Sequence, residues 1–145
     1  AVLTLPALAA AAPGYFRSPA IRGDMVVFTA EGDLWAVSTA GGLARRLTTH
    51  PAEESQAVIS PDGAQLAFVA AYDGAPELYR MPLAGGAPER LSYGGGRLLL
   101  SSWGADGALL YSSDALSGLS SFRRVLALDP ERGLERVLPP ADATE

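Results

Sequence analysis

The chain has 145 residues, of which 48% are apolar and 19% are charged, a composition typical of a folded globular domain and not of a disordered segment. Its 16 acidic residues against 11 basic ones leave a net charge of -5, which argues against a surface for nucleic acid or for an anionic membrane. The chain has no cysteine, which excludes disulfide bonds, thiolate metal sites and a cysteine nucleophile.

Residues 1–14 are expected to be either the end of a signal peptide or a disordered leader. The first 12 of them, AVLTLPALAAAA, are small and apolar, are too short to span a bilayer, and end in an alanine run that suits a signal peptidase. On the signal-peptide interpretation the mature protein begins between residues 12 and 15 and is exported. A periplasmic location is then expected, with a cytoplasmic one as the alternative.

Beyond residue 14 the sequence is typical of an all-β protein. Short apolar, β-branched or aromatic runs alternate with turns rich in Gly, Pro, Asp and Ser, and no window longer than about ten residues keeps a helical period. We expect three units, at about 15–55, 56–97 and 98–138, followed by a link to a further unit at 139–145. The strands expected in the second unit are 56–59, 65–70, 77–83 and 88–91, and those in the third are 98–102, 108–113, 122–128 and 134–138.

The units are marked by a repeat with a spacing of 44 residues. Residues 33–48 (DLWAVSTAGGLARRLT) align without a gap on residues 77–92 (ELYRMPLAGGAPERLS), with six identical positions. At the same spacing the turn Ser60-Pro61-Asp62-Gly63 aligns on Gly104-Ala105-Asp106-Gly107. A repeat of this length with four short strands is typical of a β-propeller blade. Because three blades cannot close a ring, the sequence predicts an all-β propeller fragment of about three four-stranded antiparallel blades.

Several side chains within the predicted blades have structural explanations. Arg46 and Arg90 stand at matching positions of the repeat, and each is expected to tie an outer strand to a nearby carboxylate. Aromatic residues within strands are expected to pack between neighbouring blades: Phe28, Trp35, Phe68, Tyr79, Trp103 and Tyr111.

No known catalytic motif is present. The sequence has no Gly-x-Ser-x-Gly elbow, no Walker loop and no His-Glu-x-x-His pair, and its one histidine, His50, is expected to be a polar loop residue. His50 with Glu53 and Glu54 falls short of the ligand spacing of a metal site. The sequence therefore predicts no catalytic, cofactor-binding or metal-binding residue in this chain.

The candidate contact residues lie in the rim loops, because long loops on a rigid scaffold usually carry function. In a propeller, the links between blades open on the same rim as the connections between second and third strands. Six residues are therefore expected to share one face: His50, Glu53, Glu54, Tyr72, Asp73 and Asp114. Such an acidic rim would favour basic or amine-bearing groups, although a solvated acidic surface needs no functional explanation.

The order of motifs resembles one family. Ile21-Arg22-Gly23-Asp24 is followed by Gly32-Asp33-Leu34-Trp35, then by Gly41-Gly42, by Arg45-Arg46-Leu47-Thr48 and by Ser60-Pro61-Asp62-Gly63. This order resembles the N-terminal propeller of tricorn-type serine peptidases over residues 15–138. The Ser-Pro-Asp-Gly turn alone is also similar to TolB propellers and to the propellers of prolyl-oligopeptidase-type peptidases.

The resemblance implies a six-bladed propeller followed by a second propeller, a PDZ domain and a catalytic region with a serine nucleophile. It implies peptides as substrates, the remaining blades and catalytic domains of the same chain as partners, and a homo-oligomeric enzyme. None of the family's catalytic positions falls in this segment, which would guide or filter peptide access without catalysing hydrolysis.

Two other functions remain open at this point. A TolB-like periplasmic propeller would bind other proteins, but TolB-like proteins carry an α/β domain before the propeller, for which residues 1–14 leave no room. The propeller of a prolyl-oligopeptidase-type hydrolase would be followed by a Gly-x-Ser-x-Gly elbow.

Overall fold

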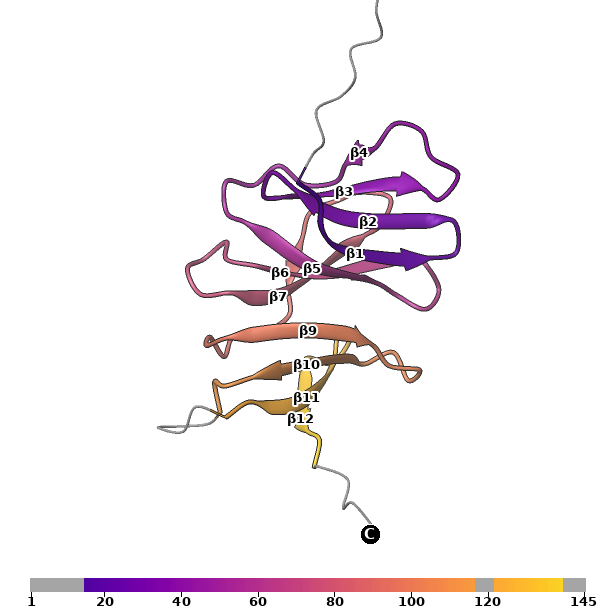
Figure 1. The fold of residues 1–145 in the computed structure, drawn as a ribbon. Coiled ribbons are helices and arrows are strands. Elements are labelled where there is room, and N and C mark those ends of the chain that lie inside the picture. Colours follow the sequence, from indigo (N-terminus) through magenta and orange to yellow (C-terminus); the bar gives the residue numbers. More distant parts are fainter. Residues whose placement is uncertain (1–14, 117–121, 140–145) are drawn as a thin grey trace, which may run out of the picture.

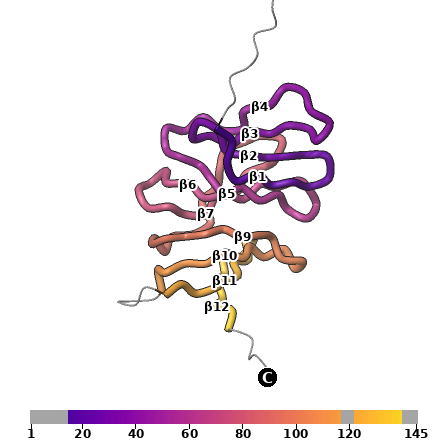
Figure 2. Tube along the Cα trace, in the orientation of Figure 1, coloured from indigo at the N-terminus to yellow at the C-terminus, as the bar shows by residue number. Residues whose placement is uncertain are grey.

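The computed structural model describes residues 15–116 and 122–139, and within these residues the chain forms three antiparallel sheets of four strands each. The sheets follow one another along the chain and lie in a stack, with the first sheet at one end and the third at the other (Figure 1). The Cα trace in Figure 2 shows that the chain completes each sheet before it starts the next. The predicted all-β propeller fragment of three four-stranded blades is confirmed.

The strands of the three blades are as follows. The first blade contains β1 (Arg17–Arg22), β2 (Met25–Ala30), β3 (Asp33–Ser38) and β4 (Arg45–Arg46). The second contains β5 (Glu54–Ile59), β6 (Gln65–Ala70), β7 (Glu77–Pro82) and β8 (Glu89–Arg90). The third contains β9 (Leu98–Trp103), β10 (Leu109–Ser113), β11 (Arg124–Asp129) and β12 (Leu134–Val137).

Most strand ends lie within one residue of the expectation, and the larger differences concern β5, β8 and β11. β5 begins two residues earlier than expected, at Glu54, whose N–H donates to the Gly32 carbonyl of the first blade at 2.8 Å. β8 lacks the first and the last of its four expected residues, and the first of these, Pro88, has no N–H to donate to the ladder. β11 begins at Arg124 and not at residue 122. The expected leader at 1–14 lies outside the described residues, as does the expected link beyond Pro139.

The inner strands of neighbouring blades lie side by side, β1 against β5 and β5 against β9. β5 carries a β-bulge between Ser55 and Val58, where Gln56 has a positive φ of 54°. The Gln56 side-chain oxygen accepts a hydrogen bond from the Leu100 N–H of β9 at 2.8 Å. The bulge therefore turns a polar side chain of one blade onto the backbone of the next.

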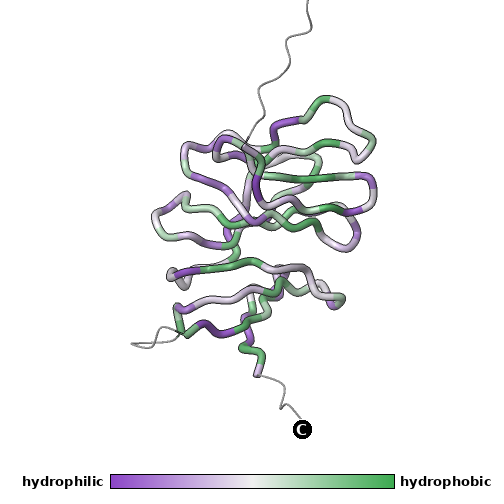
Figure 3. The backbone as a smooth tube through the Cα atoms, in the orientation of Figure 1, coloured by the Kyte–Doolittle hydropathy of each residue, from purple (hydrophilic) through white to green (hydrophobic). Residues whose placement is uncertain are grey.

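Two hydrophobic cores fill the spaces between the blades. β6 contributes to both, because its side chains alternate: Leu66 and Phe68 face the first blade, whereas Ala67 and Val69 face the third. Hydrophobic residues concentrate along the strands and hydrophilic ones at the turns (Figure 3). The buried residues of the first core are Val27, Leu34, Ala36, Ala57, Ile59, Leu66, Phe68, Ala70, Tyr79 and Met81. Those of the second are Ala67, Val69, Leu78, Leu91, Leu98, Leu100, Leu109, Tyr111, Leu126 and Leu128.

The prediction that aromatic residues pack between blades is confirmed for Phe68, Tyr79 and Tyr111, which are all buried in these cores. Phe28 lies on the outer face of the first blade, where it is half-buried and packs edge-to-face on Phe16, with ring centroids 5.0 Å apart. Trp35 is also half-buried, and its indole N–H donates to the Ala30 carbonyl of the same hairpin at 3.2 Å. Both residues belong to the first blade, whose outward face no other described sheet covers.

The Ser60-Pro61-Asp62-Gly63 turn shows how a hairpin is closed. The Gly63 N–H donates to the Ser60 carbonyl at 2.9 Å, and Gly63 has a φ of +74°, which a residue with a side chain adopts only with strain. Asp62 Oδ1 accepts hydrogen bonds from the Ser60 hydroxyl at 2.5 Å and from the Ala64 N–H at 3.0 Å.

Among the residues that the structure describes, no helix is long and apolar enough to cross a membrane.

Candidate functional site

Antiparallel strands place the loops of every blade on two opposite rims. The link rim carries the β2–β3, β6–β7 and β10–β11 turns together with the links between blades, and the hairpin rim carries all the other turns. All six candidate contact residues from the sequence lie on the link rim or just beneath it.

Three of the six candidates meet at a pocket on the link rim between the first two blades. The His50 and Tyr72 rings lie 4.1 Å apart between centroids, and the Tyr72 hydroxyl donates a hydrogen bond to Glu54. The pocket has a volume of about 420 Å³ and is also lined by Thr48, Pro51 and other residues of both blades. Its walls are largely apolar or aromatic, with the Glu54 carboxylate as the acidic group.

Glu54 differs from the expectation of an exposed rim contact, because its side chain is fully buried. Its carboxylate accepts hydrogen bonds from the Thr48 hydroxyl and from the Leu34 N–H, the latter at 3.3 Å. Thr48 and Leu34 belong to the first blade, so Glu54 joins the two blades. Burial raises the pKa of Glu54, and the hydrogen bonds from Thr48 and Tyr72 offset part of that rise.

The raised pKa of Glu54 predicts a specific pH dependence of stability. Between pH 4.5, the ordinary value, and the raised pKa, the folded chain holds a proton on Glu54 that the unfolded chain has lost. The contribution of Glu54 to the free energy of unfolding should therefore fall as the pH rises through this range. Urea unfolding of the chain and of Glu54→Gln across pH 4–8 measures the difference between them, which should shrink or reverse in sign with rising pH. The same series with Glu53→Gln, an exposed neighbour, should show no such trend, and a trend of equal size there would contradict the assignment.

The other three candidates lie apart from this pocket. Glu53 forms an ion pair with Arg17 at 2.5 Å. Asp73 accepts hydrogen bonds from Arg90 at 3.2 Å and from the Tyr79 hydroxyl at 3.3 Å. Asp114 accepts a hydrogen bond from the Arg97 N–H at 2.7 Å. The six candidates therefore do not form one cluster, since three meet at the pocket and the other three each contact an arginine elsewhere on the rim. No group of three potential metal ligands occurs among the described residues.

The prediction for Arg46 and Arg90 is confirmed. Arg46 forms an ion pair with the buried Asp33, and Arg90 forms one with the buried Glu77 at 3.2 Å. Glu77 also accepts hydrogen bonds from the Ser92 hydroxyl and, at 2.8 Å, from the Gly95 N–H. In the second blade the single carboxylate of Glu77 thus binds both Arg90 and the Ser92 hydroxyl. At the equivalent place of the first blade two carboxylates are used, Asp33 for Arg46 and Glu54 for the Thr48 hydroxyl.

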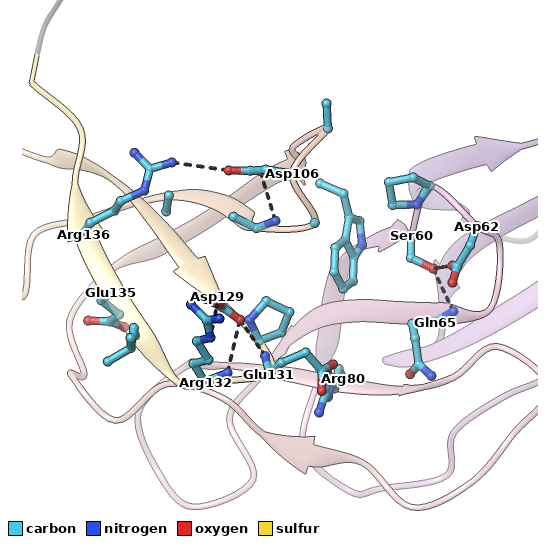
Figure 4. A pocket seen from close by; sticks show the side chains of 18 residues that line it. Ser60, Asp62, Gln65, Arg80, Asp106, Asp129, Glu131, Arg132, Glu135 and Arg136 are labelled. Carbon is cyan, nitrogen blue, oxygen red and sulfur yellow. Dashed lines mark hydrogen bonds and ion pairs between the residues drawn. The ribbon is translucent and has the colours of Figure 1, made fainter.

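A larger groove opens on the hairpin rim between the second and third blades, where the sequence predicted no contact residue. It has a volume of about 1050 Å³. Figure 4 shows Asp62 and Asp106 on opposite sides of it, with Arg80 and Glu131 along one wall. Arg80 forms an ion pair with Glu131, which connects the two blades, and Arg136 forms one with Asp106 at 3.5 Å.

Trp103 also lines this groove and is half-buried. Its indole N–H donates to the Val58 carbonyl of β5 at 3.1 Å, which confirms that Trp103 connects two blades, although the ring is not sealed inside the core. The 44-residue repeat contained the signal that could have identified the groove. It aligns Trp103 with Ile59, and an Asp-Gly turn follows each of the two residues, so a large aromatic side chain replaces an aliphatic one beside equivalent turns.

The sequence matches a family model over residues 13–145, and that family is described as the tricorn protease N-terminal beta propeller domain. The chain belongs to this family. Tricorn protease homolog 1 of Streptomyces coelicolor is 39% identical over 132 residues, which cover 89% of the chain and 12% of that relative. This tricorn-type propeller therefore spans only about an eighth of the length of the relative that it matches.

Solved structures support the fold of this tricorn-type propeller. The crystal structure of the tricorn protease matches with a TM-score of 0.71 and 23% identity, covering 81% of this chain and 12% of the tricorn chain. TolB from Acinetobacter baumannii matches with a TM-score of 0.72 and 19% identity, covering 88% of this chain and 33% of the TolB chain. At these identities the two likenesses show the fold alone, and they place the grooves described above on a propeller scaffold.

Proposed function

We propose that this chain is the propeller segment of a tricorn-type serine peptidase and that it guides or filters peptides on their way to catalytic domains elsewhere in the protein. The observation that carries the proposal is the family membership over residues 13–145, with 39% identity to a tricorn protease homolog. The open groove between the second and third blades supports it. With its ion pairs and its half-buried tryptophan, the groove offers polar and apolar contacts of the kind that an extended peptide needs.

The proposal is tested in the complete gene product by blocking the groove. Ala105 is exposed and lines the groove mouth, so Ala105→Trp should narrow the groove without disturbing a core. We expect kcat/KM for a peptide of about ten residues to fall by about fivefold or more relative to a dipeptide substrate, which needs no long path. Ala40→Trp serves as the matched control, because Ala40 is an exposed residue of the first blade and lies outside the groove.

Each result of this experiment decides one part of the proposal. A complete gene product that hydrolyses neither peptide contradicts the peptidase assignment and favours a TolB-like binding propeller. If the ratio of kcat/KM for the long peptide to kcat/KM for the dipeptide is the same in Ala105→Trp and Ala40→Trp, the guiding role is contradicted and the peptidase assignment stands.

We also propose that the protein is exported to the periplasm and that its parent enzyme is a homo-oligomer. The apolar, alanine-rich sequence of residues 1–14 supports export. Cell fractionation with N-terminal sequencing tests this, and a cytoplasmic product that retains residues 1–14 would contradict it. Light scattering of the purified gene product measures the oligomeric state.

A further inference from the structure

The three inner strands end at equivalent residues. Arg22 is the last residue of β1, and Ser60 and Gly104 come directly after β5 and β9. Each is the last residue to bond to the following strand, as the pairing of Arg22 with Met25 and two hydrogen bonds show. The Ser60 N–H donates to the Gln65 carbonyl at 2.9 Å, and the Gly104 N–H donates to the Ala108 carbonyl at 2.7 Å. A turn with an aspartate follows each of them, containing Asp24, Asp62 and Asp106 respectively.

At the first joint the protein itself supplies a cation between two such turns. The Arg22 Nε donates to the Ser60 carbonyl at 3.4 Å, so the guanidinium reaches from the first blade to the equivalent backbone position of the second. This places the positive charge of Arg22 beside the turn that contains Asp62.

At the second joint the equivalent side chain is too short to do this. Ser60 stands where the first blade has Arg22, and its hydroxyl donates to Asp62 of its own turn at 2.5 Å. The next blade has Trp103 where the second blade has Ile59. The space between the turns that contain Asp62 and Asp106 is the groove of about 1050 Å³. At the first joint the Arg22 guanidinium bridges the equivalent turns.

The charges around the groove favour a cation. Five carboxylates and three guanidinium groups line it, an excess of two negative charges. All three guanidinium groups already have carboxylate partners: Arg80 pairs with Glu131, Arg132 with Asp129 and Arg136 with Asp106. The last two pairs are largely exposed, and such pairs contribute little and exchange partners readily.

We propose that this groove binds the arginine or lysine side chain of an extended peptide, with the cationic group over the Trp103 indole and between Asp62 and Asp106. The bound cation takes the position that Arg22 occupies one blade earlier. An indole face and two carboxylates together recognise a cation more strongly than either does alone. The inference rests on the proposed peptide-guiding function and names the class of peptide that the groove selects.

The experiment uses Trp103 as its own reporter. The chain has two tryptophans, so Trp35→Phe leaves Trp103 as the one source of indole fluorescence. A capped alanine peptide with one central arginine should change this fluorescence saturably, and the same peptide with uncharged citrulline should bind about tenfold more weakly. Raising the salt concentration from about 0.1 M to 1 M should weaken binding of the arginine peptide, because ions screen the carboxylates. If Trp35→Phe fails to fold, calorimetric titration of the complete gene product with the same two peptides replaces the fluorescence.

Matched variants locate the site. Asp62→Asn and Asp106→Asn each keep the oxygen that accepts the hydrogen bond of their own turn, and each should weaken binding of the arginine peptide by about three- to tenfold. Asp24→Asn makes the same change in the first blade and should leave binding unaltered. Equal binding of both peptides, or an equal loss in Asp24→Asn, overturns the inference.

The outcomes also separate this inference from the proposed function. If Ala105→Trp still impairs hydrolysis of long peptides but arginine and citrulline peptides bind equally, the groove guides peptides without selecting basic ones. If arginine peptides bind selectively while Ala105→Trp hydrolyses long peptides normally, the groove is a binding site off the path to catalysis.

Discussion

Phe68→Ala is expected to lower the free energy of unfolding of this chain by about 3–5 kcal/mol. Phe68 is fully buried in the core between the first two blades, and its ring centroid lies 6.0 Å from that of Tyr79 and 6.3 Å from that of Tyr72. Removing the ring takes away its transfer free energy and leaves a cavity that two facing sheets cannot close. Urea unfolding followed by far-ultraviolet circular dichroism measures the loss.

Leu43→Ala is the control for Phe68→Ala. Leu43 is 99% exposed in the β3–β4 turn, so its truncation should change the free energy of unfolding by less than about 0.5 kcal/mol. A loss below about 1 kcal/mol for Phe68→Ala would mean that the blades do not pack as rigid neighbours at this joint.

Glu77→Ala is expected to have the second largest effect, a loss of about 3 kcal/mol in the free energy of unfolding. Glu77 is 2% exposed and accepts hydrogen bonds from Arg90, the Ser92 hydroxyl and the Gly95 N–H. Without the carboxylate these donors lose their shared acceptor, and the exposed Asp73 is then the carboxylate that still pairs with Arg90. Because Arg90 is a quarter exposed, water moderates the cost.

The matched change for Glu77→Ala is Glu89→Ala, which removes an exposed partner of Arg80 in the same blade. That loss should stay below about 0.5 kcal/mol. Thermal unfolding of both variants against the unaltered chain provides the comparison. Equal losses in the two variants would show that burial of Glu77 adds nothing to the stability of the blade.

The arrangement of the strands could be predicted from the sequence because two local signals agree. The Asp-Gly and Gly-Gly turns fix where each strand ends, and the 44-residue spacing of Arg46 and Arg90 fixes how the units correspond. Both arginines form the predicted ion pairs, since a residue repeated at the same place of a repeated unit meets the same neighbours.

The candidate site could be predicted only in part, because it depends on how one blade faces the next. Glu54 is next to the exposed Glu53 in sequence, yet its carboxylate lies beneath Tyr72 and is bonded to the preceding blade. The groove beside Trp103 was missed for the same reason. Its walls come from residues 60–65, 105–108 and 127–136 together with Arg80 and Trp103, and the repeat aligns these segments without showing how they face one another.

The bulge at Gln56 has a consequence for how such a chain can change in evolution. The Gln56 side chain accepts a hydrogen bond from the Leu100 N–H at the equivalent position 44 residues later, so β5 is tied to β9 by a specific bond as well as by packing. An insertion or deletion of one residue in β5 would shift the pairing register of β5 and would also leave the Leu100 N–H of β9 without its acceptor. The outer strands β4 and β8 have only two residues each. Length variation among relatives should therefore accumulate at the outer edge of the propeller, while the inner strands keep their spacing.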